Sequence, residues 1–371
     1  MKKRILTMTP FLWSGAGKLI VRLMREFAAK GIECELISSR SSKGMRDWPG
    51  YISELNEAGV RCHRIDLFDR ASECVWKSVL ELCGILQEKH YDLIHVHAGV
   101  PAFVATAARD RLQQKLPVIA TFHSWNPERP SWMNNADIWS LNRCDYVVTA
   151  SQSYLELLLQ WGLLPCKAKS IHPGVDLPEL KYLSRQSRKP RAFRILCVGR
   201  IEPRKDQKTI LQAFSYFNKQ VPDSELWLVG PPGDEAYYAK LLEDTKRFGW
   251  QHRAFFKGRV KDIGRCYRDA DLFVSASHDE GLGLSLLEAM AHEIPTVSTP
   301  VRGHMDFAKE GINTMQFPTG DPHALESAML RLYRDPVLRR NLGKKGRGTV
   351  KQMFLWRHAV GSYVDVFKSL W

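Results

Sequence analysis

The residues best placed to do chemistry lie in one stretch, 277–291, with the sequence SHDEGLGLSLLEAMA. Glu280 and Glu288 are separated by seven residues, and the glycines between them leave the backbone open to a ligand. A strand is predicted at 272–275 and a helix at 284–292, so the stretch includes a helix N-terminus, whose free N–H groups and dipole favour phosphate. Glu288, one turn inside that helix, is placed to hold ribose hydroxyls. The residues predicted to contact a nucleoside phosphate or its sugar are Glu280, Gly283, Leu284, Ser285 and Glu288.

Two cations follow another predicted strand, at 195–198. Arg200 and Lys205 lie in its loop and in the first turn of the next helix. Two positive charges there can neutralise a diphosphate as it leaves. In the first half of the chain, Gly15 and Gly17 lie between a predicted strand and a predicted helix, where a phosphate or sugar can approach the backbone closely.

Two familiar phosphate-binding motifs are excluded at Gly15 and Gly17. A dinucleotide fingerprint needs a third glycine at position 20, which is Ile20. A Walker A loop needs a glycine where Leu12 stands. The two glycines therefore predict a close approach by a ligand and no particular cofactor.

Histidines end two predicted strands of the first half. His97 follows the strand predicted at 93–96, and His123 follows the strand predicted at 118–121. His95 points to the same face of its strand as His97, but no third ligand is evident, so no metal site is predicted. A histidine at a strand end is more often structural than functional, and both interpretations stay open.

The elements that position these residues alternate between short strands and amphipathic helices in both halves of the chain. This alternation is typical of a parallel sheet covered by helices on both faces. Residues 184–192 are polar, basic and contain proline, so we interpret them as a linker. We expect an N-terminal domain at 1–183 and a C-terminal domain at 184–351, with a final helix at 352–371 that returns to the first domain.

Composition narrows the class of protein. The chain has 371 residues, of which 44% are apolar and 25% charged, as in a globular protein of two domains. No run is long and apolar enough for a membrane span or a signal peptide, and the eight cysteines show no CxxC spacing. We therefore expect reduced thiols in a cytoplasmic protein.

The net charge of +14 is unevenly divided. Residues 1–183 carry 23 basic and 19 acidic side chains, an excess of 4, and the remainder carries 31 and 21, an excess of 10. Such a surface attracts an anionic membrane, a diphosphate substrate or nucleic acid. The alternative is a solvated helix face, and residues 331–351 are expected to include one. No nucleic-acid module is recognisable, so nucleic acid is not expected as a partner.

The 277–291 stretch resembles the signature of glycosyltransferase family 4, the retaining family with the GT-B fold. Similar motifs are spread over most of the chain. In the C-terminal half they are Gly199-Arg200 with Lys205, 256–260 (FKGRV), 269–274 (DADLFV) and 317–322 (FPTGDP), and in the first half 14–17 (SGAG), 92–97 (DLIHVH), 121–123 (TFH) and 173–176 (PGVD). The C-terminal motifs are highly specific, whereas those of the first half are individually weak.

The resemblance implies two Rossmann-like domains, each with a doubly wound parallel sheet, facing a central cleft. It implies a retaining transferase that moves a hexosyl group from a nucleoside-diphosphate sugar to a lipid-linked, lipopolysaccharide or polysaccharide acceptor, in the cytoplasm or on the inner face of the cell membrane. UDP-sugars are common donors in the family and GDP-sugars the main alternative, with no other cofactor and no metal. Arg200, Lys205, Glu280 and His123 would be catalytic. Gly15, Gly17, Arg259 and Val260 would join the donor-binding residues named above.

Retention in this family is usually attributed to front-face attack, with Glu280 organising the sugar, although a covalent intermediate on a carboxylate stays an alternative. Asp269-Ala270-Asp271 spells the Asp-x-Asp that holds a metal in the other glycosyltransferase fold. Here it is expected to close a helix and enter a strand, with Asp271 structural.

We expect the acceptor to contact His97 and the aromatic stretch 124–133, which includes Trp125 and Trp132. This stretch is expected to be a loop. With Trp13, this stretch is alternatively a patch that meets a membrane or a partner. Glu293 and Arg302 depart from the family pattern, which has glycine at both positions. Arg302 puts the donor in doubt, and the alternative function is a catalytically impaired GT-B protein that binds a sugar or a partner.

Overall fold

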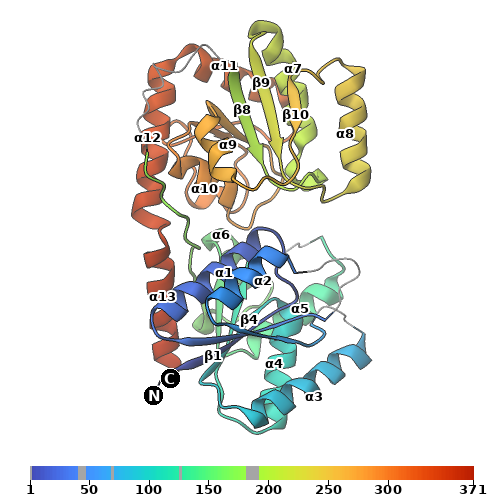
Figure 1. Cartoon of the computed structure of the whole chain (residues 1–371), viewed down its shortest axis with the longest axis vertical. Helices are drawn as coiled ribbons and strands as arrows, with labels where there is room; N and C mark the ends of the chain where they lie inside the picture. The colour runs from blue at the N-terminus through green and yellow to red at the C-terminus, as the bar shows by residue number, and fades with distance from the viewer. Residues whose placement is uncertain (1, 41–46, 68–70, 125–127, 181–191) are drawn as a thin grey trace. The chain divides into compact units, whose positions relative to one another are not determined.

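The computed structural model describes residues 2–40, 47–67, 71–124, 128–180 and 192–371 (Figure 1). It divides into two compact units. Unit 1 comprises Met1–Gly174 with Trp356–Trp371, and unit 2 comprises Val175–Leu355. The units meet in sequence at 174–175 and 355–356, whereas the sequence placed the boundaries at 183–184 and 351–352.

Unit 1 contains a seven-stranded parallel sheet in the order β3-β2-β1-β4-β5-β6-β7. Its strands are β1 (Arg4–Thr9), β2 (Glu33–Ser38), β3 (Arg61–Arg64), β4 (Leu93–His97), β5 (Val118–Phe122), β6 (Tyr146–Thr149) and β7 (Ala168–Ser170). Its helices are α1 (Ser14–Ala29), α2 (Pro49–Glu57), α3 (Ser72–Glu88), α4 (Gly99–Arg111), α5 (Ser131–Asn142), α6 (Gln152–Gln160) and α13 (Trp356–Leu370).

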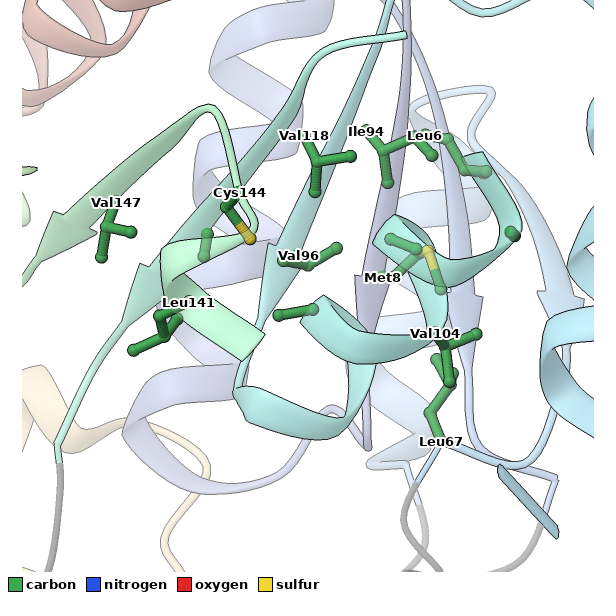
Figure 2. Close-up of a cluster of buried hydrophobic side chains, with 14 of the residues drawn as sticks. Leu6, Met8, Leu67, Ile94, Val96, Val104, Val118, Leu141, Cys144 and Val147 are labelled. Carbon is green, nitrogen blue, oxygen red and sulfur yellow. The ribbon is translucent and has the colours of Figure 1, made fainter. Parts of the chain in front are cut away.

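The middle strands of this sheet are apolar on both faces because helices cover both faces. One face contributes Leu6, Met8, Ile94 and Val96 to a core shared with α3, α4 and α5 (Figure 2). The parallel register pairs Ile5 with Leu93 and Met8 with Val96. This pairing aligns the carboxyl ends of β1 and β4 at one edge of the sheet.

Unit 2 contains a six-stranded parallel sheet in the order β10-β9-β8-β11-β12-β13. Its strands are β8 (Phe193–Val198), β9 (Ser224–Val229), β10 (Ala254–Phe256), β11 (Leu272–Ser275), β12 (Thr296–Ser298) and β13 (Met315–Gln316). Its helices are α7 (Gln207–Gln220), α8 (Glu235–Arg247), α9 (Ile263–Asp269), α10 (Leu284–Ala291), α11 (Pro322–Arg334) and α12 (Pro336–Met353). Doubly wound parallel sheets in both units confirm the predicted fold class.

The C-terminal helix α13 belongs to unit 1. Phe27 of α1 lies against Tyr363 and Phe367, with ring centroids 6.0 and 5.1 Å apart. Both α13 rings are buried, so these aromatic side chains pack the helix against unit 1.

The aromatic stretch 124–133 was predicted to be a loop, and that prediction is wrong for its end. Helix α5 begins at Ser131 and includes Trp132. Its buried face is formed by Asn134, Asp137, Ile138, Ser140 and Leu141. Because three of these five side chains are polar, the apolar periodicity that signals a helix is weak here.

Candidate functional site

The strand order of unit 2 defines where its site lies. β8 is flanked by β9 on one side and by β11 on the other. After β8 the chain continues to β9 in one direction along the sheet, and after β11 it continues to β12 in the other, so the strand order reverses between β8 and β11. Open parallel sheets bind their ligands at the carboxyl ends of the strands at such a switch point. Lys205 follows β8 and Glu280 follows β11, so both predicted site residues come from the two strands that form this point.

Lys205 and Glu280 are brought into direct contact. The Lys205 Nζ forms an ion pair with Glu280 Oε1, and Ser277 Oγ donates to the same oxygen at 2.7 Å. Both charged side chains are largely buried. Burial would by itself raise the pKa of Glu280, but the charge of Lys205 and these hydrogen bonds lower it to about 2. Glu280 is therefore a carboxylate at every physiological pH.

Arg200 is placed beside this pair but is held by another carboxylate. Its guanidinium lies 3.1 Å from Glu202 Oε2, and Arg204 approaches the other oxygen of Glu202 at 3.4 Å. The Lys205 stem passes over the backbone of Gly199, where an added Cβ would lie 3.6 Å from Lys205 Cε. Arg200 and Lys205 thus both follow β8, and each is paired with a carboxylate, Arg200 with Glu202 and Lys205 with Glu280.

The N-terminus of α10 begins after a glycine that a larger residue would replace only with strain. Gly283 has φ +94°, and a Cβ there would lie 2.5 Å from the His304 ring. The His304 Nδ1 lies 3.0 Å from the Thr299 carbonyl oxygen, so Nδ1–H donates and Nε2 is the acceptor. Nε2 is buried without a hydrogen-bond partner, and burial lowers the pKa of His304. A neutral imidazole therefore lies under the start of the helix.

Inside α10, Glu288 is held by a buried phenol. Tyr267 donates its hydroxyl to Glu288 Oε2 at 2.9 Å and lies 3.2 Å from the Ser285 carbonyl oxygen. The Tyr267 ring is buried, but Glu288 is only partly so. The Glu288 carboxylate is thereby oriented within the second turn of the helix.

The remaining predicted donor residues lie at neighbouring strand ends. Val260 follows β10 and packs against the same apolar cluster as Leu284, whereas Arg259 is exposed. Arg302 follows β12, and its Nε lies 3.8 Å from Asp279 Oδ1, next to Glu280 in sequence. The position that departs from the family pattern thus lies beside the predicted donor site.

In unit 1, Gly15 and Gly17 lie in the first turn of α1, which follows β1 at that sheet's own switch point. A Cβ on Gly17 would lie 2.8 Å from the backbone of Leu12, so Gly17 is required for the tight entry into the helix. Gly15 is exposed and is the one of the two that a ligand can approach.

His97 and His123 are also brought together. His97 Nδ1 lies 3.0 Å from His123 Nε2, and the rings are parallel within 10°. Burial lowers the pKa of His97 well below its usual value and lowers that of His123 to about 4. His123 Nδ1 is buried and has no hydrogen-bond partner. The pair is neutral at physiological pH.

A buried hydrogen-bond chain supports this pair from behind. The His95 ring lies 4.3 Å from the His97 ring, and its Nε2 bonds Thr121 Oγ1 at 2.7 Å. Thr121 Oγ1 in turn lies 3.0 Å from the Tyr363 hydroxyl of α13. Burial lowers the pKa of His95 to about 3.

The predicted acceptor residues are less well defined. Trp132 is 63% exposed on α5, and Trp125 lies outside the described residues. Asp271 accepts the Arg194 backbone N–H at 3.0 Å and so joins α9 to β8, as a structural residue does. Among the described residues, no cluster of three or more His, Cys, Asp or Glu side chains could hold a metal ion.

Sequence reasoning missed the residues that support the site. Ser277 lies within the recognised stretch, but a serine three residues before a glutamate is no signal of a contact. His304, Tyr267 and Tyr363 come from segments distant in sequence from the groups they contact, and only the folded chain brings them there.

Two doubly wound parallel sheets, with an ion pair and a helix N-terminus at the switch point of the second, define a protein of the GT-B class. Comparison with known proteins agrees. The family described as "Glycosyl transferases group 1" matches residues 182–349, and "Glycosyltransferase Family 4" matches residues 13–179. The two matches account for most of the chain, which belongs to this glycosyltransferase family.

Individual relatives are distant. The chain is 26% identical to EpsD of Bacillus subtilis (strain 168), over 81% of this chain and 82% of EpsD. It is 23% identical to N-acetyl-alpha-D-glucosaminyl L-malate synthase of Bacillus anthracis, over 77% of each. The crystal structure of Anabaena HepE in complex with UDP shares the fold over the whole of both chains, with a TM-score of 0.84 and 19% identity. No helix in the described ranges is both long and apolar enough to cross a membrane.

Proposed function

We propose that this chain is a retaining hexosyltransferase that moves a sugar from a nucleoside-diphosphate sugar to a lipid-linked, lipopolysaccharide or polysaccharide acceptor. The observation that carries the proposal is the Lys205–Glu280 pair, which lies at the switch point with Ser277 and follows β8 and β11. A cation, an ionised carboxylate and a helix N-terminus together suit a diphosphate joined to a hydroxyl-rich sugar.

The leaving diphosphate would be neutralised by protein groups. Lys205, Arg200 and the free N–H groups of Leu284 and Ser285 supply positive charge and donors where the negative charge develops. With that supply from the chain, we propose that the reaction needs no metal ion and no cofactor besides the donor.

Glu280 would bind the sugar and not transfer a proton. A carboxylate with a pKa of about 2 is a poor base and carries no proton to give at neutral pH. It accepts hydrogen bonds from sugar hydroxyls instead, which supports front-face attack with the departing phosphate taking the acceptor proton. Glu288, oriented by the Tyr267 hydroxyl, would hold the ribose.

UDP is the proposed nucleotide, and GDP is the second candidate. The Anabaena HepE structures, which share the fold, were solved with UDP and with UDP-glucose. Val260 and Arg259, at the end of β10, would contact the base. The neutral His123, whose Nδ1 lacks a partner in the protein, would bond a hydroxyl of the transferred sugar, with His97 behind it.

The competing proposal is a catalytically impaired member of the family. Its only support is the departure at Glu293 and Arg302. Glu293 adopts φ +58°, a conformation that glycine reaches more easily, which accounts for glycine in the family pattern. The turn is nevertheless formed with glutamate at this position. Arg302 pairs with Asp279, which keeps its charge next to the donor site and makes it a candidate to select an anionic sugar or to block one.

The location proposed is the cytoplasm, with the protein peripheral on the inner face of the membrane, where a lipid-linked acceptor is available. The +14 charge supports attraction to anionic lipid.

The first test is thermal unfolding with a panel of nucleoside diphosphates and their sugars, without added metal. A ligand at about 100 times its dissociation constant adds roughly 2.7 kcal/mol to the free energy of unfolding. A raised midpoint with one base, abolished in Glu288→Ala, would support the donor site and identify the nucleotide. No shift with any nucleotide in the wild type would favour the impaired protein, and Arg302→Gly would then be the first variant to make.

A further inference from the structure

Helix α12 has a buried face that packs against α10 and an outward face that is strongly basic. It packs against α10 and α11 on the outside of unit 2 (Figure 1). Gly343 and Gly346 allow this contact, because a Cβ at either position would lie within 3.1 Å of Glu293 or Met290. Between Pro336 and Met353 the helix has six cations and no acidic residue.

Two of the six cations have structural roles, and four do not. Arg347 donates to the Ala291 and Pro178 carbonyl oxygens, and Arg339 donates to the Leu332 carbonyl oxygen at 3.0 Å. The other four are Arg340, Lys344, Lys345 and Lys351, which we call the cationic stripe. All four are exposed, and none has an ion-pair partner in the described part of the chain.

The spacing of the cationic stripe places it on one side of the helix. Steps of four and seven residues join Arg340, Lys344 and Lys351, with Lys345 beside them. The helix segment from Val337 to Lys351, which contains the cationic stripe, is about 21 Å long at 1.5 Å per residue. Like charges four residues apart weaken a helix, and acidic residues at these positions would have relieved the repulsion. The stability of the helix itself does not require this concentration of cations.

Two uncharged residues, Val337 and Gly348, lie on the same face of α12. Val337 is 66% exposed there, and Gly348 has no atom within 4 Å of an added Cβ. Unlike Gly343 and Gly346, Gly348 has no packing reason to be glycine, and alanine would favour the helix. A bare position in the middle of the face lets the helix approach a flat surface closely.

We propose that the cationic stripe docks this protein on an anionic phospholipid bilayer. The inference rests on the proposed peripheral location and specifies the surface responsible. A straight row of lysine-rich charge suits a plane of anionic headgroups, with the exposed Val337 entering the interface. A nucleic acid or acidic glycan is disfavoured, because no aromatic side chain is interleaved with these cations for stacking. Docking would hold the outer face of α12 to the bilayer and leave α10 on its inner face.

The test is co-sedimentation with sucrose-loaded vesicles of phosphatidylcholine alone or with about one third phosphatidylglycerol. The variant is R340Q/K344Q/K345Q/K351Q, which keeps long side chains of good helix propensity. The matched control removes four exposed cations elsewhere in unit 2: K219Q/K240Q/K246Q/R247Q. At about 1 kcal/mol per cation, the stripe variant should lose up to roughly 10³-fold in partition coefficient at low salt, and the control should lose far less.

Each outcome decides the proposal. Wild-type binding to anionic vesicles alone, lost in the stripe variant and kept in the control, supports it. Equal losses in both variants, or no vesicle binding by the wild type, overturn it, as does wild-type binding to dextran sulfate but not to vesicles. The nucleotide-induced thermal shift, measured in parallel, should be unchanged in the stripe variant, so failure of docking is separable from failure of the donor site. If the fourfold variant does not fold, the pair K344Q/K351Q gives the same comparison with about half the effect.

Discussion

Replacing Lys205 by methionine removes one positive charge from the unit 2 site and little else. The aliphatic part of Lys205 lies near Gly199, where an added Cβ would come within 3.6 Å of Lys205 Cε, and methionine has a similar stem to fill that space. Glu280 then stays buried with only Ser277 as a hydrogen-bond partner. If Lys205 neutralises the leaving diphosphate, its loss should lower kcat by about 10²-fold or more, the scale of losing one oxyanion donor, or roughly 3 kcal/mol.

The same substitution should also destabilise the fold, because it breaks a buried ion pair from one side. The expected cost is about 3–5 kcal/mol of unfolding free energy, most of it from the uncompensated Glu280 carboxylate. The double variant Lys205→Met/Glu280→Gln removes both charges and should recover much of that stability. It should not recover turnover, because neither group is then available to the donor. Stability and catalysis are thereby separated.

The assay is steady-state turnover with the nucleotide sugar identified by thermal shift, alongside chemical unfolding of the wild type, the single variant and the double variant. Arg200→Gln is the matched comparison, since Arg200 pairs with Glu202 and not with Glu280. A Lys205→Met enzyme within twofold of the wild type would remove Lys205 from the mechanism. Recovery of turnover in the double variant would show that the single substitution acts through stability alone.

Three other perturbations test the remaining parts. Glu288→Ala should abolish the nucleotide-induced thermal shift, and Tyr267→Phe should weaken nucleotide binding by less, because it removes only the hydrogen bond that orients Glu288. Gly283→Ala should weaken donor binding at least tenfold, because the new Cβ meets the buried His304 ring. The control is Gly320→Ala, where φ is similarly positive but an added Cβ has no atom within 4 Å. An equal loss of donor binding in the control would assign the effect to backbone strain. Because the pKa of His95 falls to about 3 on folding, the unfolded state binds more protons below about pH 6.5. His95 alone should lower stability by about 2 kcal/mol between pH 7 and 5, and His97 and His123 should add to this fall. Urea titrations at several pH values should show a smaller dependence of unfolding free energy on pH in His95→Gln, whereas an unchanged dependence would exclude His95 as its source. Carboxylates such as Glu280, whose pKa is lowered, reduce the stability of the protein only below about pH 4.5.

The sequence was most informative where strands are buried and local signals agree. The predicted strand at 272–275 coincides with β11, and those at 93–96, 118–121 and 195–198 differ from β4, β5 and β8 by one or two residues at one end. Predictions failed where the local pattern is polar. The short edge strand β3 has the sequence RCHR, with no apolar alternation to mark it, and it is defined by pairing with β2.

The site was predictable to the level of which strands carry it. Lys205 and Glu280 are 75 residues apart, yet each follows a strand, and parallel strands bring their carboxyl ends to one edge. That they form an ion pair, and that Arg200 is occupied by Glu202, depends on side-chain packing that no spacing encodes. The same holds for His304, whose importance comes from lying under Gly283.

The two units place chemically opposite groups at equivalent positions of equivalent sheets. At its switch point unit 2 has ionised side chains, Lys205 and a Glu280 carboxylate with a pKa of about 2. Unit 1 has the neutral pair His97 and His123 near its own switch point, kept uncharged by burial. Charges suit a diphosphate, whereas a neutral imidazole bonds hydroxyl groups without attracting the leaving phosphate. The burial that keeps His95, His97 and His123 neutral in unit 1 therefore fits a site that meets hydroxyl groups rather than phosphate.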